Sequence, residues 1–141
     1  MKSRNSLLLM AFASVALLMA ASTPEEKTSG AAAGEKWVAP ASADKIKNPL
    51  ADNAKAWKRG KKTYDAMCAI CHGTKGKGDG IAGMALKPRP ADLTSKDVQS
   101  QSDGAIYWKL TTGKPPMASY KALLKDKQRW ELVNYIRKLK K

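Results

Sequence analysis

Both cysteines and the single histidine of this 141-residue chain fall within five consecutive residues, Cys68-Ala69-Ile70-Cys71-His72. This C-x-x-C-H spacing is typical of covalent attachment of a c-type haem, in which two thiols add to the two vinyl groups and the adjacent imidazole binds the iron. Thiols three residues apart project from one side of a single helical turn. The pentapeptide therefore predicts one haem c, attached at Cys68 and Cys71 and ligated by His72.

Three other kinds of site use the same residue types. A thioredoxin-like redox pair requires a βαβ context, whereas this pair follows helix-forming sequence and precedes a glycine-rich loop. A structural zinc site has four Cys or His ligands, and this chain contains three such residues. A disulfide across three residues would be strained and would give His72 no role. Haem attachment is the favoured interpretation.

Residues on either side of the pentapeptide add a second pattern. Gly60 and Tyr64 precede it in helix-forming sequence, and Leu132 and Tyr135 lie near the end of the chain. With these residues, the segment from about 52 to 141 resembles the class I cytochromes c, in which the matching positions of the first and last helices pack together. The resemblance implies a small all-α fold with three main helices, whose glycine- and proline-rich loops wrap around one covalently bound haem, and it implies electron transfer.

Residues 1–22 have the pattern of a secretory signal. Lys2 and Arg4 precede an apolar run from Leu7 to Ala21, and small residues follow. The run has 15 residues, fewer than the roughly 20 that span a membrane, so cleavage is favoured and an uncleaved anchor is the alternative. No cysteine follows that could carry a lipid. We expect export from a bacterial cytoplasm, to the periplasm or the periplasmic face of the membrane.

Residues 23–51 are predicted to form a flexible N-terminal arm, because they are rich in Ala, Ser, Thr, Pro and Gly and cannot bury enough apolar surface to fold alone. The one aromatic residue of this arm, Trp37, has two interpretations. It folds back on the domain, or it docks on a larger complex. Residues 52–141 then form the haem domain.

Apolar spacing predicts a first helix over about residues 53–70. Its N-terminal cap is Asp52 or Asn53. The stripe that it would bury is made of Trp57, Gly60, Tyr64 and Met67. Glycine destabilises a helix relative to alanine, so we expect another segment to approach closely at that position.

Two further helices are predicted nearer the C-terminus. One spans about residues 102–112, capped by Ser102 and ended by Gly113. Its Tyr107 and Trp108 are candidates for packing on the haem. The last helix spans about residues 126–140, and its apolar side chains are expected in the core: Trp130, Leu132, Val133, Tyr135, Ile136 and Leu139.

Two loop segments are predicted between the first and second helices. Residues 73–80 contain four glycines and should wrap flexibly around one haem edge. Residues 86–93 should be extended, because each residue before a proline avoids the helical region. In the family that this chain resembles, a proline carbonyl of this loop accepts the free ring N–H of the proximal histidine. Pro88 and Pro90 are both candidates, and the sequence does not choose between them.

The sixth iron ligand cannot be a second histidine of this chain, which leaves methionine, lysine, water or an open position. Met67 belongs to the attachment helix, and Met84 lies in the loop expected on the histidine side. Met117 lies in the loop before the last helix, a placement that resembles the axial methionine of the family, although Ala118 follows where the family often has proline. We predict Met117 as the ligand.

A His/Met haem is a low-spin electron carrier with a raised potential. Because both axial positions are filled, no small-molecule substrate would bind the iron, and no catalytic residue is predicted. The alternative is a haem enzyme or sensor whose sixth ligand can be displaced.

The formal charge is +14, and removal of Lys2 and Arg4 with the signal leaves +12. All of it falls on residues 56–141, which have 19 basic and 7 acidic side chains. Such a charge favours an acidic redox partner, for example a quinol-oxidising complex or a terminal oxidase. Nucleic acid is the other usual partner, but export and haem argue against it. The basic residues from Arg137 to Lys141 also permit membrane association with anionic lipid.

A narrower resemblance involves several short motifs. Asn48-Pro49, Gly78-Asp79-Gly80, Ser102-Asp103-Gly104 and Arg129-Trp130 are similar to segments of the monohaem cytochrome c subunit of bacterial alternative complex III. That resemblance implies quinol-oxidising machinery on one side and a terminal oxidase on the other. A free carrier and a complex subunit both pass electrons, and they differ in whether the protein diffuses.

Overall fold

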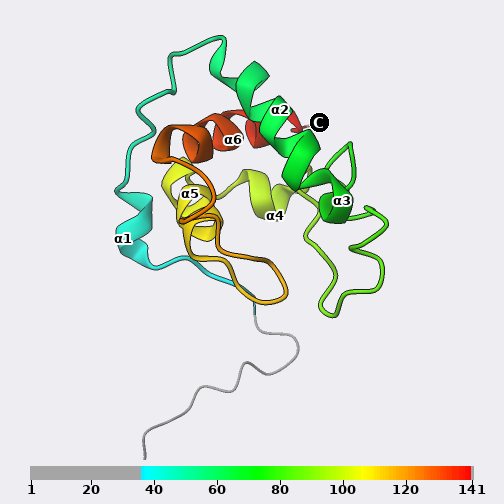
Figure 1. Cartoon of the computed structure of the whole chain (residues 1–141). Helices are drawn as coiled ribbons and strands as arrows, with labels where there is room; N and C mark the ends of the chain where they lie inside the picture. Colours follow the sequence, from blue (N-terminus) through cyan, green and yellow to red (C-terminus); the bar gives the residue numbers. More distant parts are fainter. Residues whose placement is uncertain (1–35, 141) are drawn as a thin grey trace, which may run out of the picture. The chain divides into compact units, whose positions relative to one another are not determined.

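The computed structural model describes residues 36–140. Within that range the regular structure is helical, with no strand (Figure 1). The helices are α1 (Ala41–Asp44), α2 (Ala56–Met67), α3 (Ala69–His72), α4 (Lys96–Gln99), α5 (Asp103–Thr112) and α6 (Asp126–Lys138). The all-α prediction is confirmed, and the predicted signal at 1–22 lies outside the described residues. None of the helices in 36–140 combines the length and apolar character needed to cross a membrane.

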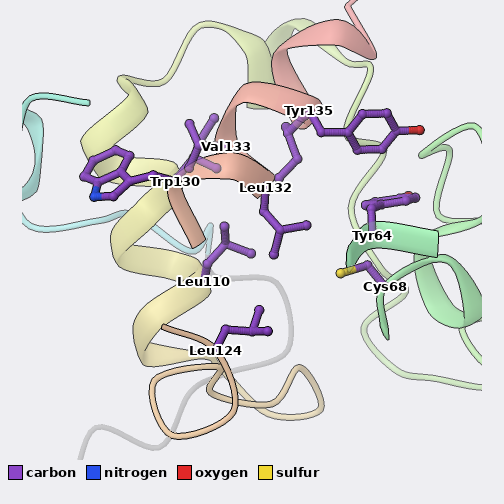
Figure 2. Packing of buried hydrophobic residues seen from close by; sticks show 10 residues of the cluster. Tyr64, Cys68, Leu110, Leu124, Trp130, Leu132, Val133 and Tyr135 are labelled. Atoms are coloured by element: carbon purple, nitrogen blue, oxygen red, sulfur yellow. The ribbon is translucent and has the colours of Figure 1, made fainter. Parts of the chain in front are cut away.

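The main helix pair is α2 with α6. At their crossing, a Cβ on Gly60 would collide with the carbonyl oxygen of Glu131 and would lie 3.0 Å from the Cβ of Tyr135. One turn further along α2, the rings of Tyr64 and Tyr135 meet with centroids 5.0 Å apart (Figure 2). The close contact expected at Gly60 is confirmed, and it explains why a helix-destabilising residue occupies the centre of α2.

The core lies between α6, α5 and the end of α2. All the α6 residues predicted for the core are buried except Leu139, which is partly buried against it. From α5, Ile106 and Leu110 join the same cluster. Figure 2 shows Cys68 facing the apolar side chains of Leu110, Leu124 and Leu132. Helices α5 and α6 and the loop between them therefore provide the apolar wall that Cys68 faces.

The predicted helix boundaries are corrected at the first helix. The expected continuous helix over 53–70 divides into α2 and α3, which meet at Cys68. Neither Asp52 nor Asn53 is the cap: α2 begins after Lys55, while the Asn53 side chain accepts a hydrogen bond from the backbone N–H of Lys55 and forms a local turn. At α5 the predictions are confirmed, since the Ser102 side chain caps the helix and Gly113 follows its end.

Residues 36–51, the described part of the predicted arm, lie against α5 and α6. The Asn48 side chain donates hydrogen bonds to Asp103 and Asn134, both at 2.7 Å. In α1, Ala43 is buried, and its carbonyl oxygen occupies the space beside Gly104 where a side chain would otherwise lie. These contacts are made by a hydrogen-bonding side chain and by the close approach of two backbone segments. The amino-acid composition, on which the prediction of a flexible arm is based, does not reveal such contacts.

The glycine-rich loop after α3 is held by main-chain hydrogen bonds. The N–H of Gly78 donates to the carbonyl of His72 at 2.8 Å, and the N–H of Leu93 donates to that of Gly76 at 2.6 Å. Gly78 has φ of +73°, a conformation that L-residues with side chains avoid. Where the sequence predicts a flexible wrap, the described loop is tied to the segment that carries the histidine.

Candidate haem site

The three residues of the attachment motif lie on one turn of chain. The carbonyl oxygen of Cys68 accepts hydrogen bonds from the N–H groups of Cys71, at 3.1 Å, and His72, at 2.9 Å. Cys68 is buried, Cys71 and His72 are half-buried, and both thiols are free. Burial is the main cause that raises the pKa of the Cys68 thiol to about 12, with Cys71 adding to the shift. The Cys68 thiol is therefore favoured in its neutral form.

The His72 ring is oriented by the loop that follows the glycine-rich segment. Its Nδ1 lies 3.2 Å from the carbonyl oxygen of Ala91, and because a carbonyl only accepts, Nδ1 must donate. The prediction that Pro88 or Pro90 accepts this bond is therefore wrong. The Pro90 carbonyl lies against Gly78 instead, since the extended chain turns successive carbonyls in different directions.

This hydrogen bond leaves Nε2 of His72 free to bind a metal. Burial lowers the pKa of the His72 imidazole, and the Ala91 hydrogen bond opposes that effect. The ring is thus favoured in the neutral form, which is the form that ligates a metal. Within residues 36–140, no cluster of three or more His, Cys, Asp or Glu side chains is arranged to hold a metal ion.

Two adjoining cavities, of about 240 and 410 Å³, open beside the attachment motif. Ligand pockets in proteins commonly measure roughly 300–1,000 Å³. The residues that line both cavities are Trp37, Cys68, His72, Ala91, Met117 and Tyr120. Apolar side chains of α5 and α6 line the smaller cavity, including Ile106, Leu110 and Leu132. Apolar walls, two thiols and a free imidazole nitrogen fit the requirements of a covalently attached haem.

Met117 lies with His72 at these cavities. Its loop is a tight turn, in which Lys114 and Met117 exchange two backbone hydrogen bonds of 3.1 and 2.8 Å. Met67 lines only the larger of the two cavities. Met84 is 52% exposed and lines neither cavity. Among the candidate methionines, Met117 is the one that both cavities share with the predicted proximal ligand.

Of the four other residues predicted at the haem site, two line a cavity and two do not. Pro88 and Pro90 line the larger cavity. Tyr107 and Trp108 line neither cavity, although they were predicted to pack on the haem. Tyr107 stacks on Trp130, with ring centroids 4.0 Å apart, and Trp108 lies beside Trp37. Because α5 turns Ile106, Lys109 and Leu110 toward the smaller cavity, Tyr107 and Trp108 point elsewhere.

Several cavity residues were missed from the sequence. Trp37, Ala91, Tyr120, Arg89 and Gln101 each line at least one cavity. None belongs to the attachment motif, and no spacing pattern joins them to it. Trp37 and Tyr120 could have been found from the sequence, because both are aromatic residues outside the predicted helices.

A buried arginine holds the loop that carries Met117. Arg129 of α6 is 3% exposed. Its Nη1 donates to the carbonyls of Leu124, at 2.7 Å, and Lys121, at 3.1 Å, and its Nη2 donates to the Tyr107 hydroxyl at 3.0 Å. The loop before α6 is therefore tied to both α5 and α6 by one guanidinium group.

A family model described as "Cytochrome C oxidase, cbb3-type, subunit III" matches residues 55–136. The chain belongs to this cytochrome c family. The match covers more than half of the chain and includes the attachment motif, Met117 and Arg129. The class I cytochrome c assignment made from the sequence is confirmed.

Solved structures also resemble this family member. One chain of the Kuenenia stuttgartiensis reducing HAO-like protein complex Kustc0457/Kustc0458 is 30% identical, with a TM-score of 0.58 over 68% of this chain and 50% of that chain. The KustC0563 c-type cytochrome is 27% identical, with a TM-score of 0.50 over 58% of this chain and 98% of its own. The present chain thus spans half the length of the first. No curated protein sequence matches it significantly.

The family match and the cytochrome neighbours show that this small all-α domain binds haem c covalently. They also support haem-based electron transfer as the role of this domain. Bound haem supplies a one-electron iron couple. The ligand set, the partners and the cellular role belong to the proposal that follows.

Proposed function

We propose that the protein carries electrons in a bacterial respiratory chain, as a free carrier or a cytochrome subunit. Its single low-spin haem is attached at Cys68 and Cys71 and ligated by His72 and Met117. The observation that supports this most strongly is that His72 and Met117, 45 residues apart in the sequence, line the same two cavities together with Cys68.

Each residue has a distinct role in the proposed site. The two thiols form the covalent links, and the Ala91 carbonyl fixes the tautomer and strengthens the donor character of His72. The turn at Lys114–Met117 presents the methionine sulfur. Apolar walls from α5 and α6 exclude water and disfavour the extra positive charge of oxidised iron, which raises the potential. With both axial positions filled by the protein, the site suits electron transfer better than catalysis.

The charge supports an acidic redox partner. Five carboxylates of the haem domain are paired with basic side chains: Asp65, Asp97, Asp103, Asp126 and Glu131. The domain still has an excess of basic residues. Candidates for docking are Lys75, Lys77, Lys87, Lys109 and Lys114, of which Lys109 and Lys114 line the cavities.

The similar Kuenenia chain belongs to a reducing HAO-like protein complex, which supports a place for this domain within a larger redox assembly. We propose export to the periplasm by residues 1–22, with membrane association through the basic C-terminus as a further option. The haem enzyme or sensor remains the alternative, and it requires that an external ligand reach the iron.

The decisive experiment tests covalent attachment in the full chain, expressed with a haem-maturation system. Haem stain should survive denaturing electrophoresis, and the double variant Cys68→Ser/Cys71→Ser should lose it. Ala69→Ser changes a neighbouring position of the same pentapeptide and should keep the stain. Colour that washes out of the unaltered protein in denaturant would sink the proposal.

A second experiment separates the carrier from the haem enzyme or sensor. The protein should exchange electrons rapidly with small redox dyes, and peroxide turnover should be negligible while the methionine–iron absorption band is intact. Substantial turnover with that band unchanged would favour the enzyme. Native electrophoresis of membrane and soluble fractions with haem staining would then distinguish a monomer-sized carrier from a subunit of a large complex.

A further inference from the structure

The two cavities have a wall that lies outside the family-matched region. Trp37 lines both of them, and Lys36 lines the smaller one. The family match begins at residue 55, so these two residues precede it by almost twenty positions. The cytochrome domain as the family defines it therefore does not account for the whole lining of the site.

Trp37 is held in place by side chains of α5. Its ring centroid is 6.2 Å from that of Trp108, and the ammonium nitrogen of Lys109 lies 5.4 Å from the Trp37 ring centroid. Lys109 is itself fixed by Gln101, whose side-chain oxygen accepts a hydrogen bond from its Nζ at 2.5 Å. An aromatic pair and a cation over the ring both stabilise the position of an indole.

The chain that follows Trp37 is anchored at two more places. The Ser102 hydroxyl donates to the Asp44 carboxylate at 2.5 Å, and Asn48 is held by Asp103 and Asn134. These contacts join the segment to the N-terminus of α5 and to α6. The path of residues 36–48 is thus fixed at both ends, which distinguishes Trp37 from a tryptophan that lies on a surface by chance.

We propose that Trp37 is a wall of the haem site, contributed by the segment before the cytochrome domain, and that it shields the bound haem from water. This inference rests on the proposed attachment of haem at Cys68 and Cys71. Removal of the indole would open the site to solvent beside α5. Water stabilises the higher charge of oxidised iron, so the reduction potential should fall when Trp37 is truncated.

Proton NMR of the reduced holoprotein gives a direct readout of this contact. A low-spin ferrous haem is diamagnetic, and its ring current shifts protons that lie against it. The indole protons of Trp37, assigned with Trp37→Phe, should be strongly shifted from their positions in the denatured protein. Trp57 lines neither cavity and is the internal reference, assigned with Trp57→Phe. Trp37 shifts no larger than those of Trp57 would overturn the proposal.

Redox titration tests the consequence. Trp37→Ala should lower the midpoint potential, Trp37→Phe should restore much of it, and Val38→Ala, at a neighbouring side chain that is 71% exposed, should leave it unchanged. Equal potentials in Trp37→Ala and Val38→Ala would contradict the shielding role. Haem staining of the same samples separates the two proposals. Without covalent haem both fail, whereas stained protein with unshifted Trp37 protons refutes the Trp37 wall alone.

Discussion

The histidine side and the methionine side of the proposed haem site are built in different ways. On the histidine side, both cysteines and His72 lie within five residues, and the Ala91 carbonyl completes the group. On the methionine side, Met117 comes from a loop that follows α5 and reaches the cavities through the packing of that loop. One side is held by local backbone geometry and the other by contacts between distant segments.

The forces that hold the two sides differ accordingly. Main-chain hydrogen bonds at Gly78 and Gly76 tie the loop of Ala91 to the histidine segment. On the methionine side, the buried guanidinium of Arg129 ties Lys121 and Leu124 to α6, and hydrogen bonds from Ser119 and Tyr120 join the same loop to α5. The comparison predicts that loss of the Arg129 side chain loosens part of the methionine side, whereas the histidine side responds mainly to changes in backbone conformation.

The largest effect is expected from Met117→Ala. It should abolish the weak sulfur-to-iron band at the red end of the ferric spectrum and lower the midpoint potential, since a methionine ligand raises it. Axial ligands tune haem potentials over a range of about 0.8 V. Met84→Ala, at an exposed methionine that lines neither cavity, is the control and should alter neither quantity. The opposite pattern would show that the methionine side is built around Met84.

The next largest effect is expected from a substitution of Arg129, whose guanidinium group holds the loop on the methionine side. Arg129→Gln should destabilise the holoprotein by roughly 1.5–3 kcal/mol, because hydrogen bonds from a charged donor contribute about that much. On heating, the sulfur-to-iron band should disappear before the helices unfold, since the covalent links and His72 remain. Circular dichroism and the ferric spectrum, recorded together, measure both events.

Lys127→Gln provides the matched control, because Lys127 is an exposed residue of the same helix. It should leave both transitions unchanged. If the band and the helices of Arg129→Gln are lost in one step, the loop of Met117 is not separately held by this side chain.

A smaller effect should follow from Gly78→Ala on the histidine side. The left-handed backbone conformation costs an alanine about 1–2 kcal/mol, and its Cβ would collide with the Pro90 carbonyl. Displacement of the adjacent Ala91 carbonyl should weaken the hydrogen bond from His72, make the imidazole a poorer donor and raise the potential. Redox titration should thus give a shift opposite in sign to that of Met117→Ala. Lys77→Ala, at the preceding exposed residue, should give none.

The smallest effect concerns the surface. Lys114→Glu beside the larger cavity should slow electron exchange with an acidic partner at low salt and should make the rate less dependent on ionic strength. Electrostatic steering as a whole changes association rates by about 10- to 1,000-fold, so one residue should account for a small part of that factor. Lys62→Glu, at an exposed lysine that lines neither cavity, is the comparison. Equal effects from both variants would mean that net charge matters and that the docking surface is not localised.

The sequence alone was sufficient for several features whose determining interactions are local, although the start of α2 after Lys55 and its end at Cys68 were not among them. The spacing of Cys68, Cys71 and His72 specifies a haem attachment segment because one turn of chain contains all three. The start and end of α5 follow from a side-chain cap at Ser102 and from Gly113, each of which acts within a few residues. The buried face of α6 follows from the 3.6-residue period, and Gly60 signalled the helix crossing because glycine is costly in a helix unless another backbone approaches.

Only the tertiary structure decided which residues surround the cavities. It assigned the histidine hydrogen bond to Ala91 in place of a proline, turned Tyr107 and Trp108 away from the site, and brought Trp37 to it from before the family-matched domain. Each of these results depends on the direction of a carbonyl or a side chain relative to a segment that is distant in the sequence. Residue type and spacing do not encode such directions, because they are set when α5, α6 and the connecting loops pack against one another.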